Sequence, residues 1–204
     1  MNFQKHLLRV AFAVAACAVP GMADIVANGG FETSSCVSDP NYVTVTPNGC
    51  ISSWIVQPDS VDYIKGYWTP QAGSYSIDLS GSSSGSISQA LTTVVGQRYA
   101  LSFWVAGNPD QQGVQTGSVS VGGTATPFSF DTTGWSRSNM GWTQHNLSFV
   151  ATTNSTILTF ASTTGGAYGP ALDSVSVNAV PEPAAIALFG LVGAACVRLR
   201  RRTA

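Results

Sequence analysis

Short runs of alternating apolar and polar residues recur through the middle of the chain, and they constrain its fold more than any other feature. In one of them Tyr99, Leu101 and Phe103 recur at every second position, which places these large side chains on one side of an extended strand. Runs of this kind lie at 75–79, 99–106, 146–149, 158–161 and 173–177, with Gly, Ser, Asn and Pro between them. Residues 24–179 contain no convincing amphipathic helix. The pattern therefore predicts an all-β fold in which two antiparallel sheets pack as a β-sandwich.

The segment 1–23 has the pattern of a secretory signal peptide. Lys5 and Arg9 supply positive charge before an uncharged apolar run at 10–19, and Gly-Met-Ala at 21–23 offers small residues to a signal peptidase. The apolar run has no polar face and ends at Pro-Gly, which argues against an amphipathic first helix of the folded domain. We therefore expect export and a mature chain that begins at Asp24, with one domain at 24–179.

The segment 180–204 carries a second targeting pattern. Pro181, Glu182 and Pro183 are followed by fourteen residues without charge and then by four arginines within 198–202. As a helix the uncharged stretch would be about 21 Å long at ~1.5 Å per residue, short of a hydrocarbon core of about 30 Å. The arginines would stay on the cytoplasmic side, so everything before the tail would lie outside.

These three parts, in this order at the C-terminus, resemble the PEP-CTERM sorting signal. The resemblance implies transient insertion into the inner membrane and recognition by an exosortase-type membrane protease. It also implies cleavage near Pro-Glu-Pro, in a bacterium that makes extracellular polysaccharide. An ordinary C-terminal membrane anchor is the alternative, although the apolar stretch is short for one.

The charge of the expected mature domain differs from that of the whole chain. The chain has a formal net charge of −1, but six of its nine basic residues lie in the two targeting segments. Residues 24–179 contain three basic and nine acidic residues, a formal charge of −6. Nucleic-acid binding needs clustered Lys and Arg and is therefore excluded as a function. Residues 24–179 also contain no phosphate-binding or dinucleotide motif, so no organic cofactor is expected.

Cys36 and Cys50 are the cysteines of residues 24–179. An exported pair most simply forms a disulfide, and this pair lacks the Cys-x-x-Cys spacing of redox sites. The bond would close a fifteen-residue loop. Such a crosslink is expected to contribute ~3 kcal/mol, mainly by restricting the unfolded chain.

A succession of short motifs covers the expected domain, beginning with Asn-Gly-Gly-Phe-Glu at 28–32. Further motifs lie at 51–54, 61–64, 76–81, 87–91, 99–103, 106–109, 142–143, 149–151, 158–160 and 168–175. Together they resemble the choice-of-anchor C family of bacterial proteins, related to the plant cell-wall proteins of domain of unknown function 642. The resemblance implies a galactose-binding-like jelly roll associated with extracellular polysaccharide.

Glu32 and Asp173 are the candidate metal ligands. Glu32 follows a glycine turn near the start of the domain, and Asp173 falls on the register of Val175 and Val177, which is expected to face inward. First and last strands of a jelly roll are often neighbours, and two buried carboxylates that meet need a counter-charge. We therefore expect a structural Ca²⁺, with main-chain carbonyls near Asn28 completing its shell. The alternative is that both carboxylates accept backbone N–H bonds and bind no metal.

Trp104 is the leading candidate for contact with a sugar. Alternation places it on the side of its strand opposite Leu101 and Phe103, where a flat ring with an N–H group suits stacking on a sugar. Trp68 and Trp135, in loop-like contexts, are further candidates, and each of these aromatics has packing as its alternative role. Asn108 ends a strand and is expected to tie its turn beside the ligand, whereas Trp54 is expected in the core.

The expected function is that of an exported, non-catalytic surface or matrix protein whose domain binds polysaccharide. The alternative is a secreted hydrolase acting on polysaccharide or its acyl esters, with activity dependent on His145, Glu32 or Ser83. Gly-Ser-Ser-Ser-Gly at 81–85 fits the Gly-x-Ser-x-Gly pattern, but a second strand rather than a helix is expected after it. A matrix subunit that binds copies of itself is a third possibility that the sequence does not separate from the first.

Overall fold

The structure, a computed structural model, describes residues 23–36, 41–47 and 49–181. The predicted signal peptide up to Met22 and the tail from Glu182, which includes Pro183, lie outside the described residues. Within the described part no helix is long and apolar enough to cross a membrane. Eleven strands form instead: β1 (Tyr42–Val45), β2 (Ile55–Val56), β3 (Val61–Lys65), β4 (Tyr75–Asp78), β5 (Ser86–Thr92), β6 (Arg98–Gly107), β7 (Val114–Val121), β8 (Thr124–Asp131), β9 (Thr143–Val150), β10 (Ser155–Ser162) and β11 (Pro170–Ala179).

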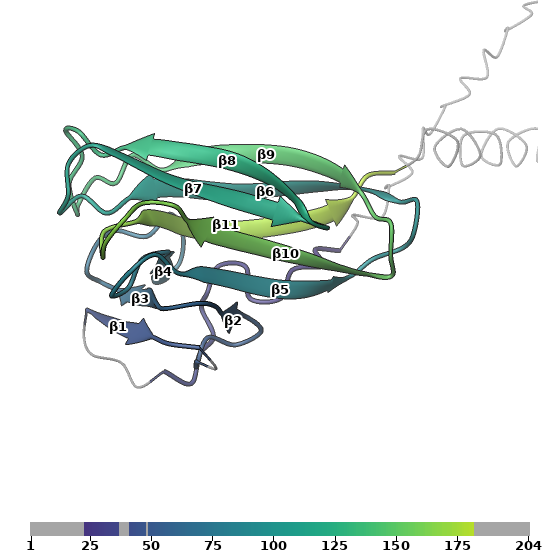
Figure 1. Ribbon diagram of the computed structural model, residues 1–204, viewed down its shortest axis with the longest axis horizontal. Coiled ribbons are helices and arrows are strands. Elements are labelled where there is room, and N and C mark those ends of the chain that lie inside the picture. The colour runs from purple at the N-terminus through teal and green to yellow at the C-terminus, as the bar shows by residue number, and fades with distance from the viewer. Residues whose placement is uncertain (1–22, 37–40, 48, 182–204) are drawn as a thin grey trace, which may run out of the picture.

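The strands form two antiparallel sheets that pack face to face (Figure 1). The six-stranded sheet has the order β1-β3-β4-β11-β6-β9, and the five-stranded sheet has the order β2-β5-β10-β7-β8. The last strand, β11, lies inside the first sheet between β4 and β6. The predicted all-β sandwich is confirmed.

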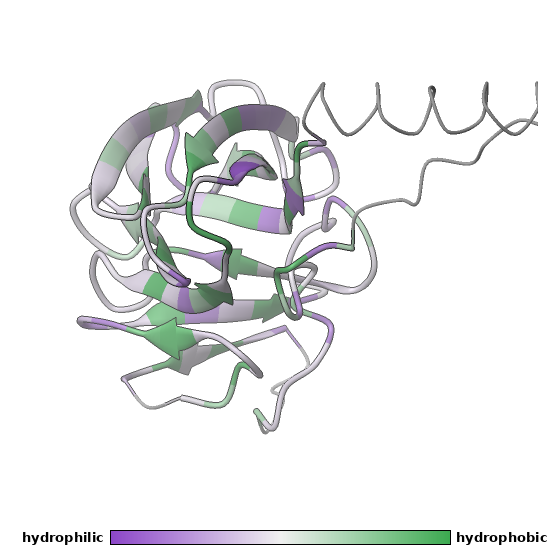
Figure 2. Cartoon of the chain, turned by 90° about the vertical axis from the view of Figure 1, so that its right-hand side faces the viewer, coloured by the Kyte–Doolittle hydropathy of each residue, from purple (hydrophilic) through white to green (hydrophobic). Residues whose placement is uncertain are grey.

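The core lies between the two sheets and follows the predicted alternation. In β6 the side chains of Leu101, Phe103 and Val105 are at most 1% exposed, and Phe103 packs on Phe160 and Phe128 of the facing sheet with ring centroids 5.0 and 5.8 Å apart. Figure 2 shows the resulting apolar and polar bands along the strands. The predicted core position of Trp54 is also confirmed, because this residue is 4% exposed.

A β-bulge in β11 changes which way Asp173 faces. The register runs from Asp173 opposite Trp104 to Ser176 opposite Ser102, so one extra residue is inserted, and Ser174 there has a φ of 50°. The prediction that Asp173 shares the inward side with Val177 was therefore wrong. Asp173 faces the outer side of the six-stranded sheet, where it is nevertheless fully buried.

The N-terminal segment lies along β11 and explains the Asn-Gly-Gly motif. Ile25 N–H donates to the Val177 carbonyl at 2.9 Å, and Val175 N–H donates to the Gly29 carbonyl at 2.9 Å. A Cβ at Gly29 would lie 1.9 Å from the Val175 carbonyl oxygen, so the approach of the two chains requires glycine. The start and the end of the domain are thus neighbours.

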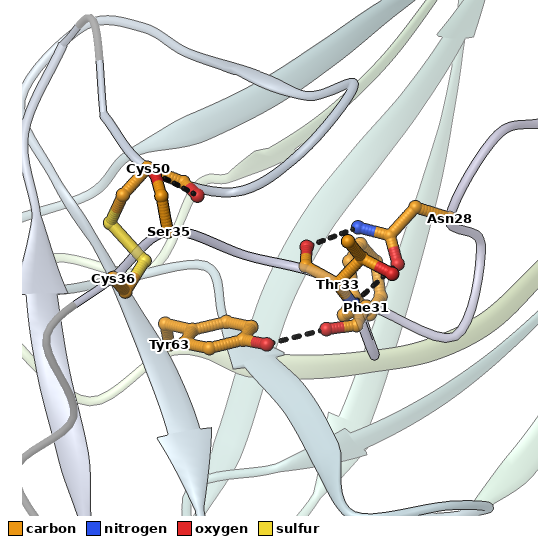
Figure 3. Close-up of a disulfide and its surroundings, with 7 residues drawn as sticks. All are labelled: Asn28, Phe31, Thr33, Ser35, Cys36, Cys50 and Tyr63. Atoms are coloured by element: carbon orange, nitrogen blue, oxygen red, sulfur yellow. Dashed lines mark hydrogen bonds between the residues drawn. A yellow bond between two sulfur atoms is a disulfide. The ribbon is translucent and has the colours of Figure 1, made fainter.

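The predicted disulfide is present and ties the N-terminal segment to the segment before β2. Cys36 and Cys50 are joined, with their Cα atoms 4.9 Å apart (Figure 3). Beside the bond Ser35 N–H donates to the Cys50 carbonyl at 2.9 Å, and Tyr63 donates its hydroxyl to the Phe31 carbonyl at 2.6 Å. The disulfide therefore crosslinks an N-terminal segment that a hydrogen bond from the buried Tyr63 also holds in place.

Candidate functional site

A depression of about 280 Å³ opens on the outer face of the six-stranded sheet, over β1 and β3. One wall is the loop at 66–74, and the opposite rim comes from the turns before β5 and before β11. The described lining residues are Tyr42, Thr44, Asp62, Ile64, Tyr67, Trp68, Gly81, Ser82, Asn108, Ala167 and Tyr168. Tyr42 and Tyr168 are 41% and 44% exposed, so their rings are available to a ligand.

Two other hollows lack titratable lining. A groove between β7, β8 and the edge strand β9 is lined by aliphatic, Thr, Ser and Phe side chains. A shallow hollow over β2 and β5 is lined by Ile, Ala, Ser, Thr and Gln. Among the described residues that line these two hollows none is charged, which makes the depression over β1 and β3 the better candidate for polar recognition.

The carboxylate of Asp62 lines the floor of the depression, and the carboxylate of Asp78 lies beside it without lining the depression. Asp62 on β3 and Asp78 on β4 are register partners, so their side chains stand on the same face of the sheet. Burial raises the pKa of Asp62, and the hydrogen bond that it accepts from Thr44 Oγ1 at 2.6 Å opposes that rise. Burial also raises the pKa of Asp78, well above its ordinary value.

Asp78 is fully buried and is held by three donors. Its Oδ1 accepts the Ser80 and Gly169 N–H groups at 2.9 and 3.1 Å, and its Oδ2 accepts Asn108 Nδ2 at 2.8 Å. The side-chain carbonyl of Asn108 accepts the Asp110 N–H at 3.1 Å, as a turn-tying residue would. Asn108 thus lines the depression, but it is 6% exposed and its amide already donates to Asp78.

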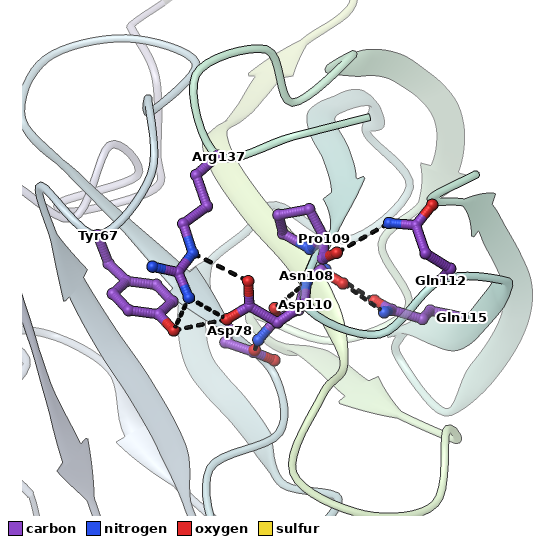
Figure 4. Close-up of polar contacts among 8 residues, drawn as sticks. All are labelled: Tyr67, Asp78, Asn108, Pro109, Asp110, Gln112, Gln115 and Arg137. Atoms are coloured by element: carbon purple, nitrogen blue, oxygen red, sulfur yellow. Dashed lines mark hydrogen bonds and ion pairs between the residues drawn. The ribbon is translucent and has the colours of Figure 1, made fainter. Parts of the chain in front are cut away.

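A cluster of three side chains closes the wall beside Asn108 (Figure 4). Arg137 donates through Nε and Nη2 to the two oxygens of Asp110, at 2.9 and 2.6 Å, and its guanidinium lies 3.9 Å above the Tyr67 ring centroid. The hydrogen bond from Arg137 lowers the pKa of Asp110, while the bond to Asp110 raises the pKa of Tyr67 to about 12. The cluster joins the turn after β6 to the loop at 66–74.

The loop at 66–74 lies across the outer face of the sheet and is anchored from below. Trp68 is 3% exposed and donates its indole N–H to Ser76 Oγ at 2.8 Å. Asp173 Oδ2 accepts the Gln71 and Ala72 N–H groups at 2.9 and 3.2 Å. Burial raises the pKa of Asp173 to about 6, and the nearby charge of Glu32 adds to that rise. Trp68 is therefore a packed wall residue rather than an open stacking surface.

Glu32 anchors the end of the same loop. Its Oε1 accepts the Ser74 and Tyr75 N–H groups at 2.9 and 3.1 Å, close to Gly73, where a Cβ would lie 2.2 Å from that oxygen. Glu32 is exposed, so the prediction of two buried carboxylates was wrong for this residue. The reason is that it binds the loop from the outer edge, whereas Asp173 lies beneath it.

These contacts bear on the calcium prediction. Three of the four carboxylate oxygens of the pair accept backbone N–H bonds, since Asp173 Oδ1 accepts from Ser174 at 2.6 Å. The carbonyls of Asn28 and Phe31 accept from Trp54 and Tyr63. In the described part of the chain no group of three or more His, Cys, Asp or Glu gathers. The contacts are those of the metal-free alternative, and calcium stays a prediction.

Trp104 and Trp135 lie outside the depression. Trp104 stands half-buried on the outer face of the sheet, between its register partners Asp173 and Gln144, which agrees with the alternation of its strand. Trp135 is 38% exposed and packs against Phe130 with ring centroids 6.3 Å apart. The predicted ligand set is thus divided: Trp68 and Asn108 line the depression, and the other two do not.

Sequence reasoning missed Tyr42, Asp62 and Tyr168. Tyr42 and Asp62 belong to short strands with a weak pattern, and Tyr168 lies in a turn. A usable signal was present for Asp62, because it is the polar residue in the run Val-Asp-Tyr-Ile at 61–64.

The residues named for a hydrolase are not assembled. His145 packs on the Phe103 ring at 5.3 Å, and burial lowers its pKa. Glu32 is bound to its loop, and Ser83 lies in the turn before β5. No pair among these three side chains is joined by a hydrogen bond in the described structure, so the arrangement needed to activate a nucleophile is missing there.

Comparison with known proteins assigns sequence families to two parts of the chain. The profile described as "Protein of unknown function (DUF642)" matches residues 24–178, and the PEP-CTERM protein-sorting motif matches residues 179–202. The chain is 37% identical over 166 residues to halomucin of Haloquadratum walsbyi. That match covers 78% of this chain and 2% of halomucin, so the chain spans only a small part of this relative.

Solved structures with a similar fold include sugar-binding modules. TmCBM61, solved with β-1,4-galactotriose, has a TM-score of 0.52 at 21% identity, with 78% of this chain and 99% of that chain covered. The CBM22-1 xylan-binding domain of Paenibacillus barcinonensis Xyn10C has a TM-score of 0.51 at 12% identity, with 81% and 99% covered. The arabinose-bound MgGH51 α-L-arabinofuranosidase has a TM-score of 0.51 at 14% identity, over 78% of this chain and 27% of that one. The predicted jelly-roll class is confirmed.

Proposed function

The chain belongs to the DUF642 family, and we propose that it is an exported, non-catalytic protein that binds polysaccharide in the depression over β1 and β3. The observation that carries the proposal is the combination of two exposed tyrosine rings with an accessible carboxylate in one concave site. A sugar ring presents C–H groups that pack on an aromatic face and hydroxyls that bond to carboxylate and hydroxyl oxygens.

The two exposed tyrosines and the acidic group of the lining each have a role in this proposal. Tyr42 and Tyr168 supply the apolar contact, and Asp62 accepts hydrogen bonds from sugar hydroxyls or other donors. Asn108 and Trp68 act indirectly, since they hold Asp78 and the loop wall in place. The ligands of the similar modules, galactotriose and xylan, support polysaccharide as the class of ligand without specifying the sugar.

The depression and the C-terminal end of the domain lie at opposite ends of the sandwich. β11 starts beside the depression, where Pro170 pairs with Gly107, and ends where Ala179 pairs with Tyr99 (Figure 1). Its ten residues span about 33 Å at ~3.3 Å per residue. A protein held by its C-terminal tail would therefore present the depression away from the membrane.

The sorting motif supports the proposed route of export. In this proposal the predicted segment 1–23 directs secretion, and the tail that begins at Val180 inserts transiently in the inner membrane until an exosortase cuts near Pro181, Glu182 and Pro183. The mature protein then acts at the cell surface or in the extracellular matrix.

Affinity electrophoresis of the full chain in detergent, through gels that contain the host's own polysaccharide, tests the binding function. We expect retardation that is reduced in Tyr42→Ala and Tyr168→Ala and unchanged in Ile55→Ala, a matched exposed apolar residue on the other sheet. Trp104→Ala and Trp135→Ala test the two remaining predicted contacts. Unretarded migration of the unmodified chain through these gels would contradict the proposed binding function.

A further inference from the structure

Asp62 is the charged group that the depression offers to a ligand. The described residues supply one donor to its carboxylate, Thr44, which bonds to Oδ1. Its register partner Asp78 adds a second carboxylate beside it, but that group is fully buried and has its own three donors. A ligand in the depression thus meets the carboxylate of Asp62, which can still accept further hydrogen bonds.

The basic residues of the domain do not balance this charge. Residues 24–179 contain Lys65, Arg98 and Arg137. The ammonium of Lys65 lies 5.6 Å from the Tyr75 ring centroid, on the opposite side of β3 from Asp62. Arg98 begins β6 at the end of the sandwich remote from the depression, and Arg137 is paired with Asp110. None of these three basic side chains therefore lines the depression or faces Asp62.

We propose that the sugar bound in the depression carries a free amino group, as in the glucosamine units of a partly de-N-acetylated polysaccharide, and that Asp62 pairs with its ammonium. This inference rests on the proposed function and names the class of sugar. An ammonium supplies three donors and the missing positive charge, and its hydrogen bond to a carboxylate is charge-assisted. The rings of Tyr42 and Tyr168 also attract a cation.

The same charges act against other sugars. A uronate or sulfated sugar would bring a further negative charge next to Asp62, and like charges in a partly buried site repel. An N-acetylated amino sugar keeps its shape but loses its charge. Burial raises the pKa of Asp62 at this site, and an ammonium partner would lower it again.

Calorimetric titration of the full chain in detergent with three β-1,4-linked tetrasaccharides tests the inference. The probes are those of glucosamine, N-acetylglucosamine and glucose, which differ only in the group at C2. We expect the glucosamine probe to bind about tenfold tighter than the other two, in line with one charge-assisted hydrogen bond. Asp62→Asn is expected to remove this preference. Asp59→Asn is the matched control, because Asp59 is exposed, lies outside the depression, and has a φ of 51° that Asn tolerates.

The outcomes separate this inference from the proposed function. Equal or tighter binding of the glucose or N-acetylglucosamine probe would overturn the amino-sugar assignment and leave polysaccharide binding standing. A loss of preference in Asp59→Asn as large as in Asp62→Asn would also overturn it, since the effect would then be one of overall charge. If none of the three probes binds, the assignment fails, and failure of the gel assay as well removes the function itself.

Discussion

Glu32 and Asp173, which are far apart in the sequence, hold the backbone of the same loop against the outer face of the six-stranded sheet. Glu32 accepts the N–H groups of Ser74 and Tyr75, and Asp173 accepts those of Gln71 and Ala72. The loop in turn forms one wall of the depression through Tyr67 and Trp68. The geometry of the candidate site thus depends on two carboxylates that do not line it.

The free energy of unfolding is expected to depend on the protonation of Asp173. Burial raises its pKa to about 6 from an ordinary value of 3.8, so the folded state holds the proton more tightly than the unfolded state. This contribution to stability is fully present below about pH 3.8 and is lost as the pH rises from there through about 6. We expect it to be on the order of 2 kcal/mol.

Denaturant unfolding between pH 4 and pH 7 measures this effect as the difference between the unmodified chain and Asp173→Asn. The unmodified chain should gain stability relative to this variant as the pH falls toward 4. A difference that is independent of pH would contradict the prediction.

Calcium binding at Glu32 and Asp173 predicts a higher melting temperature in millimolar Ca²⁺ than in chelator. Binding to the folded state alone stabilises it by about 2.7 kcal/mol when the ligand is at 100 times its Kd. Glu32→Gln and Asp173→Asn should each remove the increase, and Mg²⁺ serves as the control ion. A melting temperature that is identical in chelator and in Ca²⁺ would show that the N–H bonds are sufficient.

Asn108→Ala is expected to destabilise the fold. The change removes the Nδ2 donor of the buried Asp78 carboxylate and the acceptor of the Asp110 N–H. A charged buried group that loses a donor costs about 2–3 kcal/mol. Urea unfolding should show this loss, whereas Asn146→Ala, at an exposed position on β9, should be close to neutral. Equal stability of the two variants would show that the Asn108 amide does not stabilise the buried Asp78 carboxylate.

Loss of the disulfide is expected to lower the free energy of unfolding by ~3 kcal/mol for a loop of this length. Cys36→Ser/Cys50→Ser and the reduced unmodified chain should show the same loss, because both free the same segment. Thermal unfolding with and without reductant measures it. An unchanged melting temperature on reduction would show that the Tyr63 and Ser35 hydrogen bonds hold the segment without the crosslink.

The sequence alone determined the class of fold and the side of each strand that enters the core. A period of two residues places Leu101, Phe103 and Val105 together whatever the neighbouring strands are, and the two cysteines of the domain left one pairing. The family resemblance and the sorting motif were likewise legible in the order of short motifs. The narrower choice-of-anchor C grouping stays a prediction.

Only the tertiary structure decided what happens on the outer face of the sheet. Alternation cannot anticipate a bulge, so it assigned Asp173 to the wrong side. Nor can alternation anticipate a loop that covers the outer face. Polar residues such as Ser76 and Asp78 lie on the side opposite the core and are nevertheless fully buried. The depression joins Tyr42, Asp62 and Tyr168 because β1 and β3 pair beside the turn before β11. Such a site depends on contacts between distant segments, and local patterning contains no information about them.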